Sequence, residues 1–251
     1  MGSNIKTIAI SGGNGKMGML LSDLIDNNKL YEISGVYDPV SNNDKYPNFQ
    51  NYNEIKADYV FEFSPANQVN ENIKYQLDKN INYGLIVGSS GLTNESIDIL
   101  KQISEHRLVI IIPNFSVGAS YQKMISVILS EEFENKHIIE KHHLNKKDAP
   151  SATAINLAKN IESENNSISE NETENILNII NNIQIESIRS DEYLAEQIVN
   201  MSNESEIFIT EHIVKDRKAY LSGINLVLDN LSMLDGYYFG LESILKDRFK
   251  I

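Results

Sequence analysis

The densest group of reactive side chains lies in residues 140–154, which read Glu-Lys-His-His-Leu-Asn-Lys-Lys-Asp-Ala-Pro-Ser-Ala-Thr-Ala. Its adjacent histidines, His142 and His143, project to opposite faces if they end a strand, so the two cannot share one task. An imidazole titrates near neutral pH, and Lys146 can donate a proton or pair with an anion. The segment therefore predicts a site for proton transfer beside a negatively charged small molecule.

The end of the same segment favours the start of a helix near residues 151–153. The first turn of a helix offers unpaired N–H groups, and a hydroxyl beside them completes a seat for a carboxylate. Plainer interpretations stay open, with one histidine as a buried packing residue and Lys146-Lys147 as a solvated charge pair. A zinc site is not expected, because no H-x-x-x-H or H-x-x-E-H pattern and no cysteine accompanies these residues.

A second group of functional residues lies near the N-terminus, where an apolar run leads into Gly12, Gly15 and Gly18. Glycines at this spacing allow a tight turn, close approach of a pyrophosphate and a helix packed against its strand. Asp38 ends the next apolar run, where an acid can accept hydrogen bonds from ribose hydroxyls. An ordinary glycine turn and a turn aspartate before Pro39 are the alternatives, but together these features favour a dinucleotide site.

Short apolar runs alternate with helix-like segments through the first half of the chain, which predicts a parallel sheet covered on both faces. Right-handed crossovers then give a Rossmann-like, doubly wound α/β fold. The expected strands are 7–11, 33–37, 59–63, 83–87 and 108–112, and the expected helices are 17–26, 67–77 and 95–104.

The second half predicts a smaller α+β domain, followed by a return to the first domain. The expected helices are 118–129, 152–162 and 221–231, and the expected strands are 138–142, 183–188 and 206–214. Residues 163–175 are almost all Ser, Asn, Glu and Thr, and we interpret them as a solvated loop or a loose helix start without a chemical role. We therefore expect a dinucleotide-binding domain at 1–114, an inserted α+β domain at 115–223 and a C-terminal return at 224–251.

The composition limits the range of functions. The 251 residues are 41% hydrophobic and carry a formal net charge of −13, so we expect no nucleic-acid partner, because an acidic surface repels phosphates. The absence of cysteine excludes disulfides and thiol catalysis. No run is long and apolar enough for a membrane span and no signal peptide is recognisable, so we expect a cytoplasmic protein without a membrane partner.

Residues 140–154 closely resemble the signature E-x-H-H-x-x-K-x-D-A-P-S-G-T-A of the 4-hydroxy-tetrahydrodipicolinate reductase family. The positions that match are Glu140, His142, His143, Lys146, Asp148, Ala149, Pro150, Ser151, Thr153 and Ala154. Residues 15–18, Phe63-Ser64-Pro65, Gly88-Ser89-Ser90-Gly91 and residues 113–118 resemble further family segments in the family's order. The resemblance covers nearly the whole chain. It implies an NADH- or NADPH-dependent oxidoreductase of the diaminopimelate–lysine pathway that acts on a small dicarboxylate.

The resemblance also implies roles for individual residues. His142 and Lys146 would be the catalytic residues that move the proton, and the substrate carboxylates would bind His143, Ala152 and Thr153. The residues implied to line the cofactor are Gly12, Gly13, Asn14, Gly15, Lys16, Met17, Asp38, Gly88, Ser89, Ser90, Ile112, Pro113, Asn114 and Phe115. No metal is implied. The inserted domain would bind the substrate and join subunits through its sheet, with a homotetramer favoured over a dimer.

Departures from the family pattern refine these expectations. Ala152 stands where the family usually has Gly, and its methyl group would crowd a carboxylate or require a different backbone angle. Pro39 stands where some members carry Arg, so a 2′-phosphate beside Asp38 would be poorly neutralised. We therefore expect NADH to be preferred, with partial compensation by Lys16. Arg189-Ser190-Asp191 and Gln197 replace residues that are often Gly and His in the family, which weakens the match in the second domain and the expectation of a tetramer.

Two rival functions fit parts of the sequence. Another nicotinamide reductase, acting on an amino acid or an imine, would share the architecture but not the His-His-x-x-Lys segment. A non-catalytic dinucleotide sensor would also share the fold. The intact pair of His142 and Lys146, together with the lack of a basic DNA-binding helix, favours an enzyme over a sensor.

Overall fold

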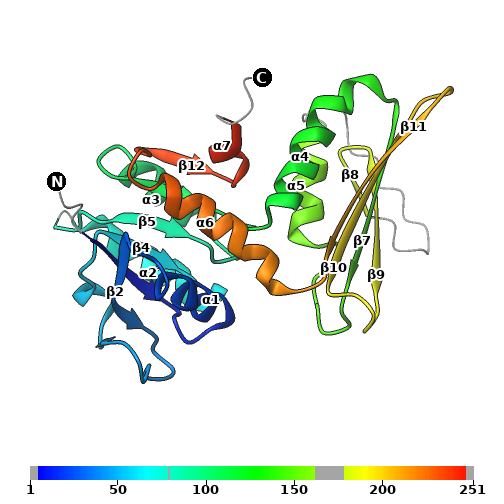
Figure 1. The fold of residues 1–251 in the computed structure, drawn as a ribbon. Helices are drawn as coiled ribbons and strands as arrows, with labels where there is room; N and C mark the ends of the chain where they lie inside the picture. The colour runs from blue at the N-terminus through cyan, green and yellow to red at the C-terminus, as the bar shows by residue number, and fades with distance from the viewer. Residues whose placement is uncertain (1–4, 79, 162–177, 247–251) are drawn as a thin grey trace. The chain divides into compact units, whose positions relative to one another are not determined.

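The computed structural model describes residues 5–78, 80–161 and 178–246 (Figure 1). These residues form two compact units. Unit 1 takes the described residues up to Phe115 and those from Tyr220 onward, and unit 2 takes the described part of Ser116–Ala219. The solvated loop expected at residues 163–175 lies outside the described residues.

Unit 1 is built on a seven-stranded sheet of order β12-β6-β5-β4-β1-β2-β3, in which every pairing is parallel. The strands are β1 Lys6–Ser11, β2 Tyr31–Tyr37, β3 Asn48–Phe49, β4 Tyr59–Glu62, β5 Gly84–Val87, β6 Val109–Ile111 and β12 Tyr237–Phe239. Their apolar runs are buried on both faces, as in residues 8–10 and 85–87. From β1 the chain adds β2 and β3 on one side and then β4, β5 and β6 on the other, so the strand order reverses between β1 and β4. Sheets of this kind bind ligands at the carboxyl ends of the strands next to that reversal.

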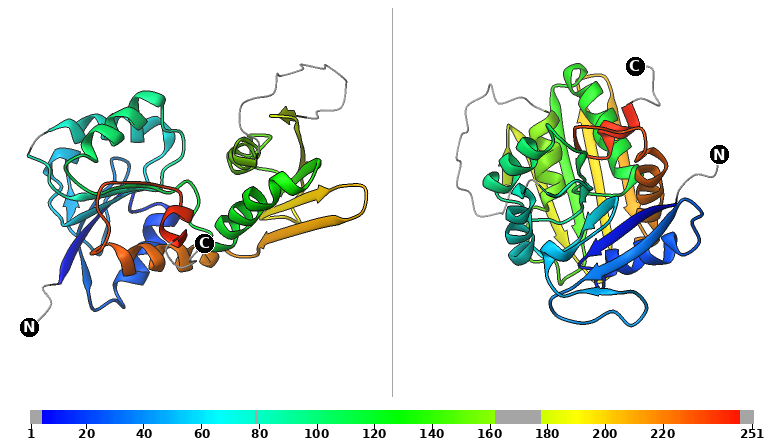
Figure 2. Two further views of the ribbon diagram at one scale, coloured as in Figure 1. Left: turned by 90° about the horizontal axis from the view of Figure 1, so that it is seen from above. Right: turned by 90° about the vertical axis from the view of Figure 1, so that its left-hand side faces the viewer.

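Helices cover both faces of this sheet (Figure 2). On one face, α2 (Ala66–Lys74) and α3 (Asn94–Ile103) share an apolar core with the strands. On the other face, α1 (Lys16–Ile25) packs against α6 (Leu221–Asn230). The Tyr31 hydroxyl, which lies at the start of β2, donates to the Leu228 carbonyl in α6 at 2.7 Å. These layers confirm the expected Rossmann-like, doubly wound fold.

The C-terminal part of unit 1 contains two short elements that the sequence did not predict. Strand β12 adds to the edge of the sheet in parallel with β6, and α7 (Glu242–Leu245) follows it. The strand comprises only three residues, all partly or largely exposed, so it lacks the buried apolar run that revealed the other strands.

Unit 2 is a mixed five-stranded sheet of order β11-β10-β7-β9-β8, with two helices on one face (Figures 1 and 2). The strands are β7 Asn135–His142, β8 Asn178–Ile180, β9 Ile183–Arg189, β10 Ala195–Ser202 and β11 Ile207–Val214. The helices are α4 Val117–Leu129 and α5 Ala152–Ile161. Leu157 and Ile161 of α5 pack into the core with Ile138, Ile185 and Val199 of the sheet.

Strand β10 is the largest element that the sequence did not predict, although it lies in the middle of the sheet between β11 and β7. Gln197, Val199 and Met201 are buried, while the residues between them are partly exposed. This alternation suits a sheet with one covered face. Polar residues such as Asn200 and Ser202 dilute the apolar pattern, and pairing along both edges stabilises the strand instead.

Candidate active site

The carboxyl end of β7 buries a carboxylate. Because successive strand residues point to opposite faces, Ile138, Glu140 and His142 share one face of the sheet. Ile138 and Glu140 are fully buried, and the His142 side chain is 16% exposed. A buried carboxylate is costly unless donors or cations surround it.

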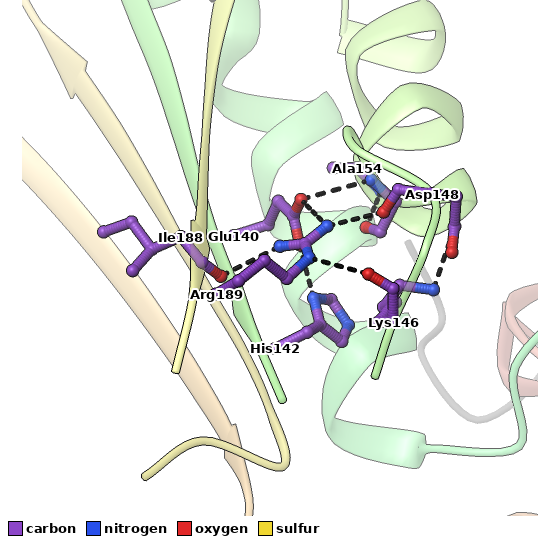
Figure 3. Close-up of polar contacts among 8 residues, drawn as sticks. Glu140, His142, Lys146, Asp148, Ala154, Ile188 and Arg189 are labelled. Atoms are coloured by element: carbon purple, nitrogen blue, oxygen red, sulfur yellow. Dashed lines mark hydrogen bonds and ion pairs between the residues drawn. The ribbon is translucent and has the colours of Figure 1, made fainter. Parts of the chain in front are cut away.

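Glu140 is surrounded by such donors (Figure 3). Arg189 Nη2 donates to its Oε1 at 2.8 Å, the Ser151 N–H donates to the same oxygen at 3.3 Å, and His142 Nδ1 bonds to Oε2. Burial acts to raise the pKa of Glu140, but the hydrogen bonds from His142 and Arg189 outweigh it and lower the pKa to about 2. The carboxyl group is therefore ionised at neutral pH.

The charge on Glu140 fixes the orientation of His142. An ionised carboxylate can only accept hydrogen bonds, so the Nδ1 of His142 must carry the hydrogen in this contact. The other ring nitrogen, Nε2, is then the one that can exchange a proton with a bound molecule. The sequence matched Glu140 to the family signature but indicated no role for it.

Lys146 lies in the loop that follows β7. Its N–H donates to the His143 carbonyl at 3.0 Å, and its ammonium donates to Asp148 Oδ2 at 2.9 Å. Burial acts to raise the pKa of Asp148, but the hydrogen bond and charge of Lys146 outweigh it and lower that pKa. The Lys146 side chain is 24% exposed, so its ammonium can also meet the carboxylate of a ligand.

Helix α5 begins directly after this loop. The Ser151 hydroxyl accepts the Ala154 N–H at 3.2 Å and so caps the first turn. Ala152 and Thr153 are exposed at the helix start. Residues 142–153 thus combine an imidazole, an ammonium and the first turn of a helix, which are groups that bind carboxylates.

The glycine turn of unit 1 has the backbone that close approach to a pyrophosphate requires. Gly12 has a φ of +72°, and a Cβ there would lie 2.7 Å from the carbonyl carbon of Phe63. A Cβ on Gly18 would lie 2.5 Å from the Gly13 Cα. Helix α1 begins after Gly15, which has no side chain to cap it, so the first N–H groups can bind an anion.

Asp38, just after β2, is held against this turn. Its Oδ2 accepts the Asn14 N–H at 3.3 Å, and its Oδ1 accepts the Val40 N–H at 3.1 Å. The Asn14 side chain donates to the Ser41 carbonyl and accepts from the Asn43 side chain, both at 2.8 Å. The acid therefore lies next to the glycine turn, where it can reach the ribose of a dinucleotide.

The other cofactor candidates also follow strand ends, with residues 88–90 after β5 and residues 112–115 after β6. The ring of Phe63, just after β4, lies 5.8 Å from that of Phe115, and a Cβ on Gly88 would lie 2.4 Å from it. Phe63 therefore lies between residues 88–90 and residues 112–115. The sequence matched its motif to the family but gave it no role. The turn, the uncapped helix and the acid together fit a dinucleotide.

Two further findings concern the described residues alone. No group of three or more His, Cys, Asp or Glu side chains among them is arranged to hold a metal ion. No helix in these ranges is long and apolar enough to cross a membrane.

Comparison with protein families accounts for both units. The family model described as "Dihydrodipicolinate reductase, N-terminus" matches residues 6–115, and the one described as "Dihydrodipicolinate reductase, C-terminus" matches residues 117–245. The chain belongs to the dihydrodipicolinate reductase family. The boundary between the two family models coincides with the point where the chain first passes from unit 1 to unit 2, and the second model also covers the return to unit 1.

Individual relatives of the dihydrodipicolinate reductase family agree with this result. The 4-hydroxy-tetrahydrodipicolinate reductase of Streptococcus uberis is 26% identical over 95% of this chain and 98% of its own length. The enzyme of that name from Legionella pneumophila (strain Corby) is 35% identical over 61% of each chain. A dipicolinate-bound dihydrodipicolinate reductase from Paenisporosarcina sp. TG-14 matches with a TM-score of 0.77 and 25% identity, covering 96% of this chain and 100% of that chain.

Membership in the dihydrodipicolinate reductase family makes the chain an NAD(P)H-dependent oxidoreductase of diaminopimelate and lysine biosynthesis. The resemblance found in the sequence is confirmed, and the enzyme is favoured over a non-catalytic sensor. A myo-inositol dehydrogenase from Corynebacterium glutamicum matches with a TM-score of 0.64 at 12% identity, a likeness that shows the fold alone.

Proposed function

We propose that this enzyme reduces dihydrodipicolinate, formed by loss of water from 4-hydroxy-tetrahydrodipicolinate, to tetrahydrodipicolinate. The arrangement at the end of β7 carries the proposal. There, ionised Glu140 orients His142, and the loop that follows brings Lys146 and the start of α5. These groups offer two proton donors and several partners for carboxylates, which suits a ring that bears two carboxylates.

The chemistry requires one hydride and one proton. When bound, the dihydronicotinamide supplies the hydride to the ring carbon distal to the imine of the C=C–C=N system. His142 or Lys146 then gives a proton to the resulting enamine. His142 suits this step because Glu140 holds its Nδ1 and leaves Nε2 to face the substrate, and the ammonium of Lys146 is the second donor.

The two substrate carboxylates require their own partners. We propose His143, the Thr153 hydroxyl and the Ala152 N–H, because the exposed start of α5 attracts anions. The Ala152 N–H contributes to lowering the pKa of the Asp148 carboxyl group, so a substrate carboxylate would compete with Asp148 for this N–H. Holding the ring at both carboxylates orients it for hydride transfer, and such orientation contributes a large part of an enzyme's rate enhancement.

We propose that residues 12–17, 38, 88–90 and 112–115 bind the cofactor, and that NADH is preferred. Between Asp38 and Asn48 the one basic residue is Lys45, and its ammonium pairs with Asp26. Lys16 is exposed at the start of α1, and its ammonium would neutralise a 2′-phosphate only in part. A 2′-phosphate would therefore meet the Asp38 carboxylate without a matching cation. Titration should show tighter binding of NADH than of NADPH, and equal affinities would contradict the preference.

The uncovered face of the unit 2 sheet supports a homo-oligomer. Ile207, Ile209 and Ile213 on β11 are 69%, 59% and 44% exposed. Exposed apolar rows of this kind mark interfaces. We propose a cytoplasmic homotetramer, with a dimer as the alternative, in which residues 115–223 bind substrate and join subunits. Residues 1–114 and 224–251 would form the dinucleotide-binding part. Light scattering should give the mass of four chains, and a monomer would contradict the proposal.

A coupled assay tests the function. The substrate is generated in place by the synthase that precedes this step, and NADH consumption is followed by absorbance. We expect consumption that depends on both the synthase and this enzyme. The reductase from Streptococcus uberis serves as a positive control. Activity of that control without activity of this chain would contradict the proposed function.

A further inference from the structure

Arg189 is the last residue of β9 and lies beside His142 in the parallel pairing of β9 with β7. Its side chain is 17% exposed. In the sequence, Arg189 lies well outside residues 140–154, the segment that carries His142 and Lys146. Its guanidinium nevertheless reaches that segment through several contacts.

The contacts of Arg189 join a strand to a loop (Figure 3). Nη2 donates to Glu140 Oε1 at 2.8 Å and to the Asp148 carbonyl at 2.6 Å, while Nε donates to the Lys146 carbonyl at 3.3 Å. Nη1 donates to the Ile188 carbonyl at 2.9 Å. Four of the five N–H donors of a guanidinium are therefore used within the protein.

These contacts differ in kind from a surface ion pair. A rigid, planar guanidinium can meet a carboxylate and two backbone carbonyls at once, whereas an ammonium is a single point of charge on a flexible stem. The two carbonyls belong to the loop that presents Lys146, and the carboxylate belongs to the acid that orients His142. One side chain therefore connects the supports of both proposed proton donors.

We propose that Arg189 is a positioning residue for the reduction: it holds the loop of residues 143–150 against Glu140 and so fixes the placement of Lys146 relative to His142. This inference rests on the proposed function, because it concerns the same site. Arg189 acts through its neighbours rather than on the substrate, since four of its five donors are already occupied by protein atoms.

Two other roles make different predictions. A direct substrate contact would raise KM when Arg189 is removed and leave kcat nearly unchanged. A purely structural role would lower the melting temperature and weaken NADH binding together with activity. Positioning predicts a loss in kcat, with NADH binding preserved, because misplacement of reacting groups slows the chemical step.

The test compares R189Q and R189K with K74Q. The K74Q variant removes the same charge from an exposed ion pair with Glu71 on α2 of unit 1, and it serves as the matched control. We expect R189Q to lose about 10²-fold in kcat, with changes of no more than about threefold in KM and in the Kd for NADH. R189K should keep its fold but also lose roughly tenfold in kcat, because its ammonium cannot span the three acceptors.

Several results would overturn the inference. One is a kcat for R189Q equal to that of K74Q, and another is a loss confined to KM. If R189Q fails to fold, R189K decides, and a wild-type kcat in that folded variant would refute the role. A wild-type enzyme without turnover would instead refute the proposed function, so the two failures are distinguishable.

Discussion

Glu140 has two oxygens that serve different partners, since Oε2 meets His142 and Oε1 meets Arg189 and the Ser151 N–H. The carboxylate therefore links the imidazole to the strand and to the helix start. Such a buried group is stable only while its partners remain in place, because its desolvation cost is otherwise uncompensated. The proton chemistry assigned to His142 depends on this arrangement.

His142 and Lys146 should each be needed for turnover and not for cofactor binding. Replacing either by Ala should lower kcat by about 10²- to 10⁴-fold, the usual range for a lost proton donor. The Kd for NADH, measured by fluorescence, should stay close to that of the wild type. Replacement of His106, an exposed histidine in unit 1, by Ala is the control and should leave kcat unchanged. Loss of NADH binding in H142A or K146A would argue against the assigned roles.

The low pKa of Glu140 predicts a pH-dependent contribution to stability. The folded pKa of about 2 lies below the ordinary value of 4.5, so the stabilisation is complete above pH 4.5 and is lost as the pH falls toward 2. Its full size is on the order of 3 kcal/mol. The difference in unfolding free energy between wild type and E140Q, measured in urea, should therefore shrink between about pH 4.5 and 3. A difference that stays constant over this range would contradict the prediction.

Among the elements, the glycine turn after β1 is the one on which the proposed cofactor site depends most. The positive φ of Gly12 and its closeness to the Phe63 backbone both require glycine. Behind the Phe63 loop, the fully buried Glu62 accepts the Ser64 N–H at 2.8 Å and the Asn72 side-chain amide at 3.1 Å. Buried hydrogen bonds of this kind hold a loop rigidly.

Replacing Gly12 by Ala should weaken NADH binding by tenfold or more, because strain at positive φ costs about 1–2 kcal/mol and the new methyl group also meets the Phe63 carbonyl. The matched control is G236A. Gly236 has a φ of +79° and open space around the position of a Cβ, so that variant carries the same backbone strain without a clash. It should keep its affinity for NADH. Equal affinities for G12A and wild type in a fluorescence titration would refute the role of the turn.

The elements differ in how well the sequence predicts them. Strands such as β5 and β6 are continuous apolar runs buried on both faces, so their pattern is visible locally. Strand β10 alternates buried residues with partly exposed ones and includes Asn200 and Ser202, so only its pairing with two neighbours defines it. Strand β8 is a three-residue strand that pairs with β9, and it too was not predicted.

Some candidate site residues can be predicted from a local motif, whereas others are revealed only by the fold. His142, Lys146 and Thr153 lie within one short segment, so a local signature is enough to propose them. The contact between Arg189 and Glu140 joins residues separated by 49 positions and depends on the parallel pairing of β9 with β7. No spacing in the sequence indicates such a contact. Phe63 is similar, because its position between Gly88 and Phe115 depends on the order of the strands.

At the scale of the whole molecule, the two proposed binding functions fall on different units. The glycine turn and Asp38, proposed to bind the dinucleotide, belong to unit 1, and the imidazole, the ammonium and the helix start, proposed to bind the dicarboxylate, belong to unit 2. The two family models match residues 6–115 and 117–245. We propose that hydride passes from a nicotinamide bound by unit 1 to a ring bound by unit 2.

Isotope transfer tests this claim most directly. NADH that carries deuterium at the transferred position of the nicotinamide is supplied together with the synthase that forms the substrate, and the product is analysed by mass spectrometry. We predict tetrahydrodipicolinate heavier by about one mass unit, with one deuterium per NADH consumed, because the hydride moves directly to the ring. Consumption of the labelled NADH without deuterium in the product would contradict the account.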